Sequence, residues 1–157
     1  MKYVIAILVG GIAAGTLDIL SAFATYVPRG ATAGGILRFI ASGLLGSAAL
    51  KGHALEAAIG LAIHFSLTTT MAAVYVGAAA RLPILLRQPW LFGWVYGVLV
   101  YLAMTYVIVP HSAVANWKAA TGWAIVGGLL AHTMYVGVPI AHAARRFLEE
   151  SKSAAAT

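Results

Sequence analysis

Three ionisable side chains lie deep inside long apolar stretches of the chain, and these are the residues whose types could do chemistry. Asp18 is the only charge between residues 3 and 27, and His64 and His132 each lie near the middle of a later stretch. An ionisable group at bilayer depth costs at least ~2.5 kcal/mol on insertion scales, so it usually faces protein or water. A carboxylate beside imidazoles can pass protons, hold a divalent metal, or bind a cationic or polar ligand.

The three groups are predicted to share one region of a helical bundle. Each lies on a stripe of small or polar residues spaced by three and four positions, and Tyr75 and Tyr101 lie on such stripes as well. At 1.5 Å per residue, Asp18 and His64 fall about 4 Å to the outer side of the midplane, Tyr101 about 2 Å, and His132 near zero. We therefore expect one polar site, with Asp18 as its charge centre, the two histidines as proton-accepting or ligand-contacting groups, and the two tyrosines as orienting hydrogen-bond partners.

Two other interpretations use the same residues. The groups can form interhelical hydrogen bonds worth only ~0.6–2 kcal/mol, with Asp18 neutral or paired with Arg38. Alternatively, His64 and His132 can be the axial ligands of a haem or bind a divalent metal. No His-Glu-x-x-His or His-x-x-x-His spacing strengthens a metal site, and the absence of cysteine excludes iron–sulfur clusters and thiolate catalysis. We predict no catalytic residue and no cofactor.

The composition identifies the kind of element that must position these groups. Of the 157 residues, 62% are hydrophobic and only 9% are charged, against about 25% charged in ordinary soluble domains. The mean hydropathy is +0.92. These values exclude a soluble single domain and indicate an integral membrane protein. The net charge of +6 comes from basic residues placed singly between apolar runs, where they set topology and meet anionic lipids rather than nucleic acid.

Four apolar stretches are long enough to span a bilayer, which takes roughly 20 residues as a helix. They cover residues 3–27, 54–79, 90–110 and 121–143. The stretch 36–50 is opened by Arg38, and its uncharged part reaches only about 18 Å as a helix. We therefore predict an all-α integral membrane fold with four transmembrane helices and one short interfacial or re-entrant helix after the first span. Residues 1–148 form a single bundle, and residues 149–157 form a polar tail.

The flanking charges and aromatic residues give the expected orientation. The first stretch is longer than the apolar core of a signal peptide, so we expect it to be retained as a membrane helix. With four spans, one side holds six basic residues: Lys2, Arg81, Arg87, Arg145, Arg146 and Lys152. The other side holds four: Arg29, Arg38, Lys51 and Lys118. Because cytoplasmic loops are enriched in Lys and Arg, both termini are predicted to be cytoplasmic. Five spans with the N-terminus outside would give six against three, so length rather than charge favours four.

Several short motifs follow one another along the chain. They are Ala14-Gly15-Thr16-x-Asp18, Ile40-Ala41-Ser42-Gly43-Leu44-Leu45-Gly46, His64-Phe65, Tyr75, Pro83, Gly97, Tyr101, Tyr106, Pro110, His132, Gly137-x-Pro139-Ile140-Ala141 and Arg145-Arg146. In these motifs the chain resembles a widespread group of small bacterial inner-membrane proteins related to the YagU-like proteins. The resemblance implies a multi-span protein of the bacterial inner membrane, and it supplies no established catalytic residues.

The expected function follows from the polar site and not from any recognisable reaction chemistry. No nucleophile–base pair is visible, so we expect a non-enzymatic membrane protein with a buried site for binding or moving a proton or small solute. The alternative is a structural or accessory subunit that docks on a larger complex through small-residue faces such as Gly11-x-x-x-Gly15 and Gly93-x-x-x-Gly97. The expected partners are membrane lipids and a second copy or another membrane protein, because four short helices enclose little volume. Nucleic acid is not expected.

Overall fold

The fold is a bundle of long apolar helices. The computed structural model describes residues 1–114, 117–118 and 120–153, and within those ranges there is helix and connecting loop but no strand. Five helical stretches are long and apolar enough to cross a membrane: Lys2–Arg29, Ala33–Lys51, Ala54–Arg81, Pro89–Ile108 and Trp123–Glu149. The all-α class predicted from the sequence is confirmed, and these helices are those of a multi-pass membrane protein.

The helical segments follow the predicted apolar stretches closely. In chain order they are α1 (Lys2–Tyr26), η1 (Val27–Arg29), α2 (Ala33–Leu45), η2 (Gly46–Lys51), α3 (Ala54–Arg81), α4 (Ile84–Arg87), α5 (Pro89–Ala103), η3 (Met104–Ile108), α6 (Trp123–Leu130), η4 (Ala131–Gly137) and α7 (Val138–Ser153). Segments η1 and η2 are 3₁₀ turns, whereas η3 and η4 are π-helical.

The last helix continues beyond the point where the sequence predicts a polar tail. The tail was expected from Glu149 onward, but α7 runs to Ser153. Arg145 Nε forms an ion pair with Glu149 Oε2 at 3.0 Å. The two residues are one helical turn apart, so the pair links the predicted end of the bundle to the continuing helix. Residues 154–157 of the predicted tail lie outside the described residues.

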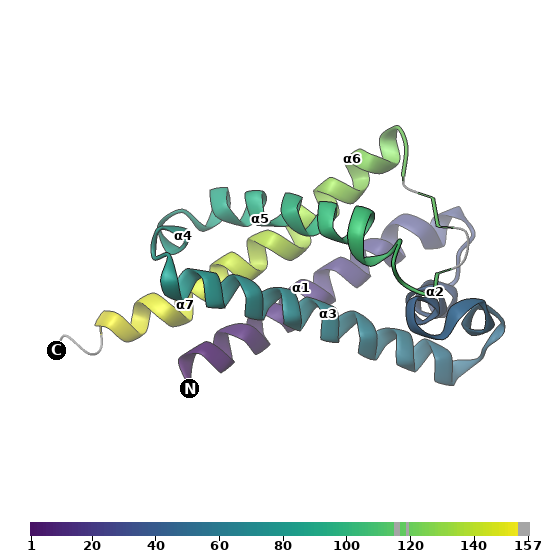
Figure 1. Cartoon of the computed structure of the whole chain (residues 1–157), viewed down its shortest axis with the longest axis horizontal. Helices are drawn as coiled ribbons and strands as arrows, with labels where there is room; N and C mark the ends of the chain where they lie inside the picture. The colour runs from purple at the N-terminus through teal and green to yellow at the C-terminus, as the bar shows by residue number, and fades with distance from the viewer. Residues whose placement is uncertain (115–116, 119, 154–157) are drawn as a thin grey trace.

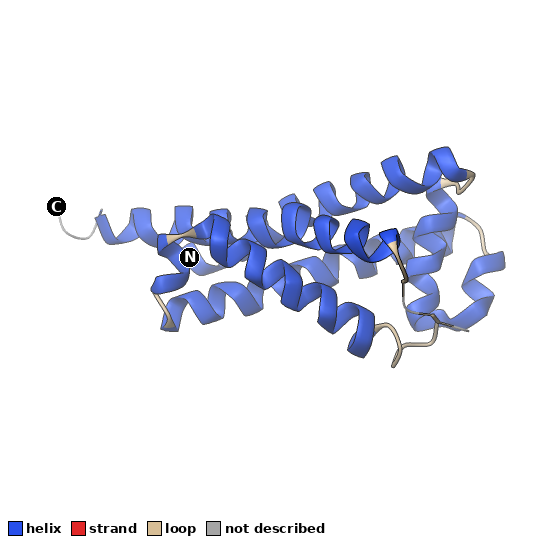
Figure 2. Ribbon diagram, turned by 90° about the horizontal axis from the view of Figure 1, so that it is seen from above, coloured by secondary structure: helices blue, strands red, loops and turns tan. Residues whose placement is uncertain are grey.

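The long helices run side by side along the molecule and leave the short helix at one end. In Figure 1, α1, α3, α5 and the continuous α6–η4–α7 rod lie lengthwise, and the two termini lie at the same end. Figure 1 looks almost along the axis of α2, and Figure 2 shows that this segment crosses the opposite end of the bundle. We call the end that carries both termini the terminal end and the other the α2 end.

Small residues bring the long helices into backbone contact. A Cβ atom placed on Gly11 of α1 would lie 2.7 Å from Thr69 Cα of α3, and one placed on Gly93 of α5 would lie 2.8 Å from Val138 Cα of α7. These distances leave no room for a side chain. The close approach predicted from Gly11-x-x-x-Gly15 and Gly93-x-x-x-Gly97 is therefore confirmed, and both faces are used inside the chain.

The buried core lies toward the terminal end. It joins the first half of α1, the second half of α3, α4 and α7, and it is rich in alanine: Ala6, Ala14, Ala72, Tyr75, Val76, Ala79, Leu86, Val100, Val136, Ile140, Ala141, Ala144 and Leu148. By contrast, α6 at the α2 end has no buried residue. The helices thus pack tightly where the termini lie and separate toward α2.

Each of the two π-helical segments ends two residues before a proline. Segment η3 ends at Ile108 before Pro110, and η4 ends at Gly137 before Pro139. Proline lacks the backbone N–H, and its ring clashes with the carbonyl four residues earlier. A widened turn removes that clash, and such π-bulges occur frequently at functional sites. The second of them contains His132.

Helix α2 is fixed across the α2 end by its cap and by one glycine of α3. The Thr32 side chain accepts a hydrogen bond from the Gly35 N–H at 3.0 Å, which starts the helix. The carbonyl of Leu37 and the amide of Ala41 lie so close to Gly60 that a Cβ there would overlap them. This crossing holds α2 against the side of α3 and places its apolar face beside α1.

Candidate functional site

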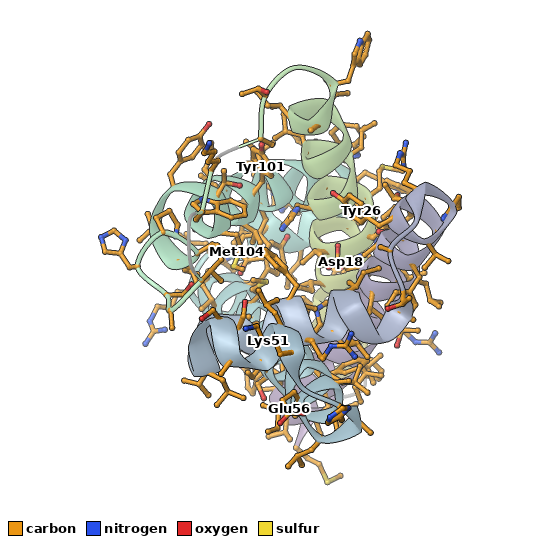
Figure 3. The ribbon with its side chains drawn as sticks, turned by 90° about the vertical axis from the view of Figure 1, so that its right-hand side faces the viewer. Asp18, Tyr26, Lys51, Glu56, Tyr101 and Met104 are labelled. Carbon is orange, nitrogen blue, oxygen red and sulfur yellow. The ribbon has the colours of Figure 1, made fainter. Side chains whose placement is uncertain are left out.

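Asp18 lies on α1 where the helices begin to separate, and its carboxylate has no partner among the described residues. The residue is half-buried. Among the residues that the structure describes, no group donates a hydrogen bond to the carboxylate and no cation forms an ion pair with it. Ser21 Oγ donates to the backbone carbonyl of Asp18 at 2.8 Å, not to the side chain. In Figure 3, which looks at the α2 end, Asp18 lies within the bundle, whereas Lys51 and Glu56 lie beside α2.

The first of two pockets that Asp18 lines is polar, and it lies between α1 and the α6–η4 segment. Its volume is about 510 Å³. The side chains that give it polar character are Asp18, Ser21, Thr25, Tyr26, Arg29, Trp123 and His132. We call this the polar pocket. The Arg29 guanidinium donates to the carbonyl of Thr25, which holds the cation on the last turn of the same helix.

His132 lines the polar pocket, and one of its ring nitrogens bonds to its own helix. Its Nδ1 lies 2.9 Å from the carbonyl oxygen of Gly128. Because a carbonyl only accepts, Nδ1 carries the proton and donates, which leaves Nε2 of the neutral ring as an acceptor. The ring therefore offers a lone pair on the side away from its own helix.

The second pocket that Asp18 lines lies toward α2 and α3 and is mostly apolar. Its volume is about 400 Å³, and α1, α2, α3, η3 and the loop after η3 enclose it. Apolar side chains form most of the wall, and Asp18, His64 and Ser112 supply its polar groups: the lining is Asp18, Phe39, Ile40, Gly43, Leu44, Ile63, His64, Leu67, Met104, Ile108, Val109, Ser112 and Val114. We call this the apolar pocket.

His64 is held against α1 near Asp18. It is 7% exposed, and its Nε2 lies 2.9 Å from the carbonyl oxygen of Gly15. Nε2–H is the donor for the same reason as in His132, so Nδ1 is the acceptor of the neutral ring. Phe65 contacts the ring edge-on, with centroids 5.5 Å apart. Gly15 precedes Asp18 by three residues, which is about 4.5 Å along the helix, so His64 and Asp18 lie within one turn of each other in depth.

The structure thus brings Asp18 together with each histidine, but in two separate pockets. Asp18 lines both, His132 lines only the polar pocket, and His64 lines only the apolar pocket. Within the described ranges, no three His, Asp or Glu side chains are arranged to hold a metal ion.

Tyr101 lies behind His132 and carries an unpaired hydroxyl. The two rings meet edge-on with centroids 5.6 Å apart. Tyr101 is 5% exposed, and its hydroxyl has no hydrogen-bond partner in the described part of the chain. A Cβ on Gly128 would lie 2.7 Å from the tyrosine ring, so this glycine makes room for it. Tyr101 supports the His132 ring without lining either pocket.

Tyr75 lies away from the predicted site. Its hydroxyl donates to the carbonyl oxygen of Leu85 at 3.0 Å, which ties α3 to α4 at the terminal end. Its ring packs edge-on against Tyr96, whose hydroxyl donates to the Met71 carbonyl at 2.7 Å. The helical stripe that Tyr75 shares with His64 extends too far along α3 for both to reach Asp18.

Arg38 does not pair with Asp18. Its guanidinium nitrogens lie beside Gly34 and Gly35 on its own helix, and it is close enough to Glu56 to interact electrostatically with it. Its Nε is buried without a partner in the described residues. Helix α2 turns Arg38 toward α3 and turns Phe39 and Ile40 toward the apolar pocket.

Two features of the site are missing from the sequence prediction. Arg29 was not predicted as a site residue, but it lines the polar pocket. It follows Thr25 by four residues, so it continues the helical stripe of Asp18, Ser21 and Thr25, and that spacing could have identified it. The π-helical turn around His132 had Pro139 as its signal.

No family model matches the chain, and no curated protein or solved structure matches it significantly.

Proposed function

We propose that this chain is a multi-pass membrane protein in which Asp18 binds a proton or a small solute within the membrane. The observation that carries the proposal is the half-buried carboxylate of Asp18, which has no partner in the described residues and lines two pockets. A charge left unpaired on a membrane helix is costly, and such residues usually mark ion or proton pathways. A purely structural carboxylate would be expected to accept hydrogen bonds from a neighbouring helix.

The two histidines give Asp18 different neighbours. On the polar side, the Nε2 lone pair of His132 is an acceptor in the same pocket as the carboxylate, so a proton that enters from the α2 end can be held by either group. On the apolar side, His64 is fixed by its bond to Gly15 and is less free to reorient. In this proposal Asp18 is the binding group, His132 exchanges protons with it, and His64 shapes the opposite wall.

We propose that four helices cross the membrane and that α2 lies at the outer interface as a short re-entrant or interfacial helix. The lengthwise path of the four long rods, the crosswise path of α2 and the two termini at one end support an even number of crossings (Figures 1 and 2). The bias of six basic residues against four supports cytoplasmic termini. The resemblance of the sequence motifs to the YagU-like proteins is the support for proposing a bacterial inner membrane as its location.

The role of accessory subunit has less support. The glycine faces that were expected to dock on a partner already contact other helices of the same chain, as Gly11 does with Thr69 and Gly93 with Val138. A partner would have to use a different surface. We nevertheless expect a transport pathway to need a second copy, because four short helices enclose little volume.

The experiment is a measurement of proton and solute flux in proteoliposomes. The wild-type protein is compared with Asp18→Asn and His132→Ala, and Glu56→Gln serves as the matched control because Glu56 is a carboxylate at the same end that lines neither pocket. We expect Asp18→Asn to abolish the protein-dependent flux, His132→Ala to lower it, and Glu56→Gln to leave it unchanged. Equal flux in wild type and Asp18→Asn would refute the proposal.

A further inference from the structure

The apolar pocket has a composition that is unusual for a proton site. Its wall is built mostly from aliphatic side chains, one phenylalanine and one methionine, yet the Asp18 carboxylate opens into it. A proton or an inorganic cation needs polar ligands, and this wall offers few of them. A ligand that buries apolar surface and carries one positive charge would satisfy both the wall and the carboxylate.

The pocket also lies within reach of the lipid. Three of its lining residues are exposed on the outer surface: Phe39 is 44% exposed, Leu44 69% and Ile108 41%. A molecule dissolved among the acyl chains can therefore enter without passing through the polar pocket. Phe39 adds an aromatic ring that can make a cation–π interaction.

We propose that the apolar pocket binds a lipophilic monocation, such as a bulky protonated amine or a quaternary onium ion, and that this cation pairs with Asp18 in competition with a proton. The inference rests on the proposed function, because it takes Asp18 as the binding group. Charge is conserved at the site: one cation enters the apolar pocket as one proton leaves the carboxylate. In this proposal the proton reaches Asp18 through the polar pocket, which lies toward α6 and η4 rather than toward α2 and α3.

The remaining charged and titratable groups are compatible with this exchange. In the apolar pocket, His64 of α3 is the titratable group beside Asp18. In the polar pocket, the groups are His132 of η4 together with Tyr26 and Arg29 near the end of α1. Arg38, the cation of α2, lines neither pocket. In the described residues the apolar pocket therefore holds no Lys or Arg that would repel a cation. Protonation of either histidine would repel the cation and weaken its binding, as protonation of Asp18 also would.

The first test is binding of tetraphenylphosphonium to the full chain in nanodiscs, measured by equilibrium dialysis over a range of pH. We expect saturable binding that weakens as the pH falls, because protonation removes the negative charge. Asp18→Asn should lower the affinity by about tenfold or more, since it removes the charge that pairs with the cation. Glu56→Gln should bind as wild type does. Absence of saturable binding, or equal binding by Asp18→Asn, would overturn the proposal.

A second pair of variants separates the pockets without touching Asp18. Gly43 lines the apolar pocket, and the nearest atoms to a Cβ there are 3.8 Å away; Gly127 lines the polar pocket, and a Cβ there has no neighbour within 4 Å. Gly43→Val should weaken phosphonium binding at least severalfold, whereas Gly127→Val should leave it unchanged. The opposite order would place the cation in the polar pocket and contradict the inference.

Failure of this inference is distinguishable from failure of the proposed function. If the wild-type protein shows proton flux that depends on Asp18 but no phosphonium binding, the lipophilic cation is wrong and the proton site stands. If Asp18→Asn changes neither flux nor binding, both proposals are wrong.

Discussion

The two ends of the bundle are built in different ways from similar residues. At the terminal end, alanine and glycine let α1, α3, α5 and α7 pack through their backbones, and nearly every inward-facing residue is buried. At the α2 end the same helices separate, α6 buries no residue, and two pockets open on either side of Asp18. Both ends are apolar, so composition does not distinguish them. They differ in how far apart the helices lie.

The difference shows how a small membrane protein can keep a charge at bilayer depth. We expect the tightly packed half to supply most of the stability. The open half carries Asp18, whose carboxylate has no partner among the described residues and lines both pockets. In water the hydrophobic effect would close such gaps, but lipid chains cover apolar helix faces at little cost, so association depends on close packing. The glycine contacts at the terminal end are therefore expected to dominate stability.

The largest effect should come from adding one methyl group at a backbone contact of the packed half. A Cβ on Gly93 would lie 2.8 Å from Val138 Cα and 3.0 Å from the Gly137 carbonyl oxygen, so Gly93→Ala must push α5 away from α7. We expect a loss of about 1–3 kcal/mol of unfolding free energy, measured by steric trapping in bicelles.

Gly127 on α6 provides the control for Gly93. A Cβ at Gly127 meets no atom within 4 Å, so Gly127→Ala should cost nothing and gain up to about 1 kcal/mol from better helix propensity. If the two substitutions had equal effects, the contrast between the two ends would be wrong.

A smaller effect is expected from two tyrosine hydroxyls, one at each end. Tyr75→Phe removes the bond to the Leu85 carbonyl and should cost about 1 kcal/mol of unfolding free energy. Tyr101→Phe removes a buried hydroxyl that has no partner in the described residues, and it should leave stability unchanged or raise it slightly. The same unfolding measurement tests both. A larger loss for Tyr101→Phe would mean that its hydroxyl has a partner in the native membrane.

The smallest effect should come from the exposed ion pair between Arg145 and Glu149. Its side chains are 48% and 41% exposed, and exposed i,i+4 pairs contribute about 0.3–0.5 kcal/mol. Glu149→Gln should therefore lower the unfolding free energy by no more than about 0.5 kcal/mol, and added salt should remove the difference. A loss above about 1 kcal/mol would show that charge contributes to the packed half as well.

Much of the fold was predictable because the bilayer imposes simple length rules. The bounds of α1 and α3 follow from long apolar runs, each with a single acidic residue, whereas the segment predicted at 36–50 extends over Ala33–Lys51 and is also long enough to cross a membrane. The continuation of α7 beyond Glu149 was missed, because a polar sequence next to a membrane does not reveal whether the helix stops. The two π-helical turns were missed although Pro110 and Pro139 signalled them.

The site was only partly predictable, for a geometric reason. Depth along a helix can be calculated from residue number, and His64 bonds to the carbonyl of Gly15, three residues before Asp18. Which pocket each histidine lines depends on the angles between the helices, and tertiary contacts such as that of Gly60 with Leu37 set these angles. The division into two pockets, with Asp18 between them, therefore could not be read from the spacing of three residues.

The central claim is that Asp18 takes up and releases a proton inside the membrane, and infrared difference spectroscopy tests it most directly. The full chain in nanodiscs is titrated with pH, and the carboxyl stretching band is compared between wild type, Asp18→Asn and Glu56→Gln. We predict a protonated carboxyl band that appears as the pH falls in wild type and in Glu56→Gln and is missing in Asp18→Asn. A wild-type band that persists unchanged in Asp18→Asn would contradict the account.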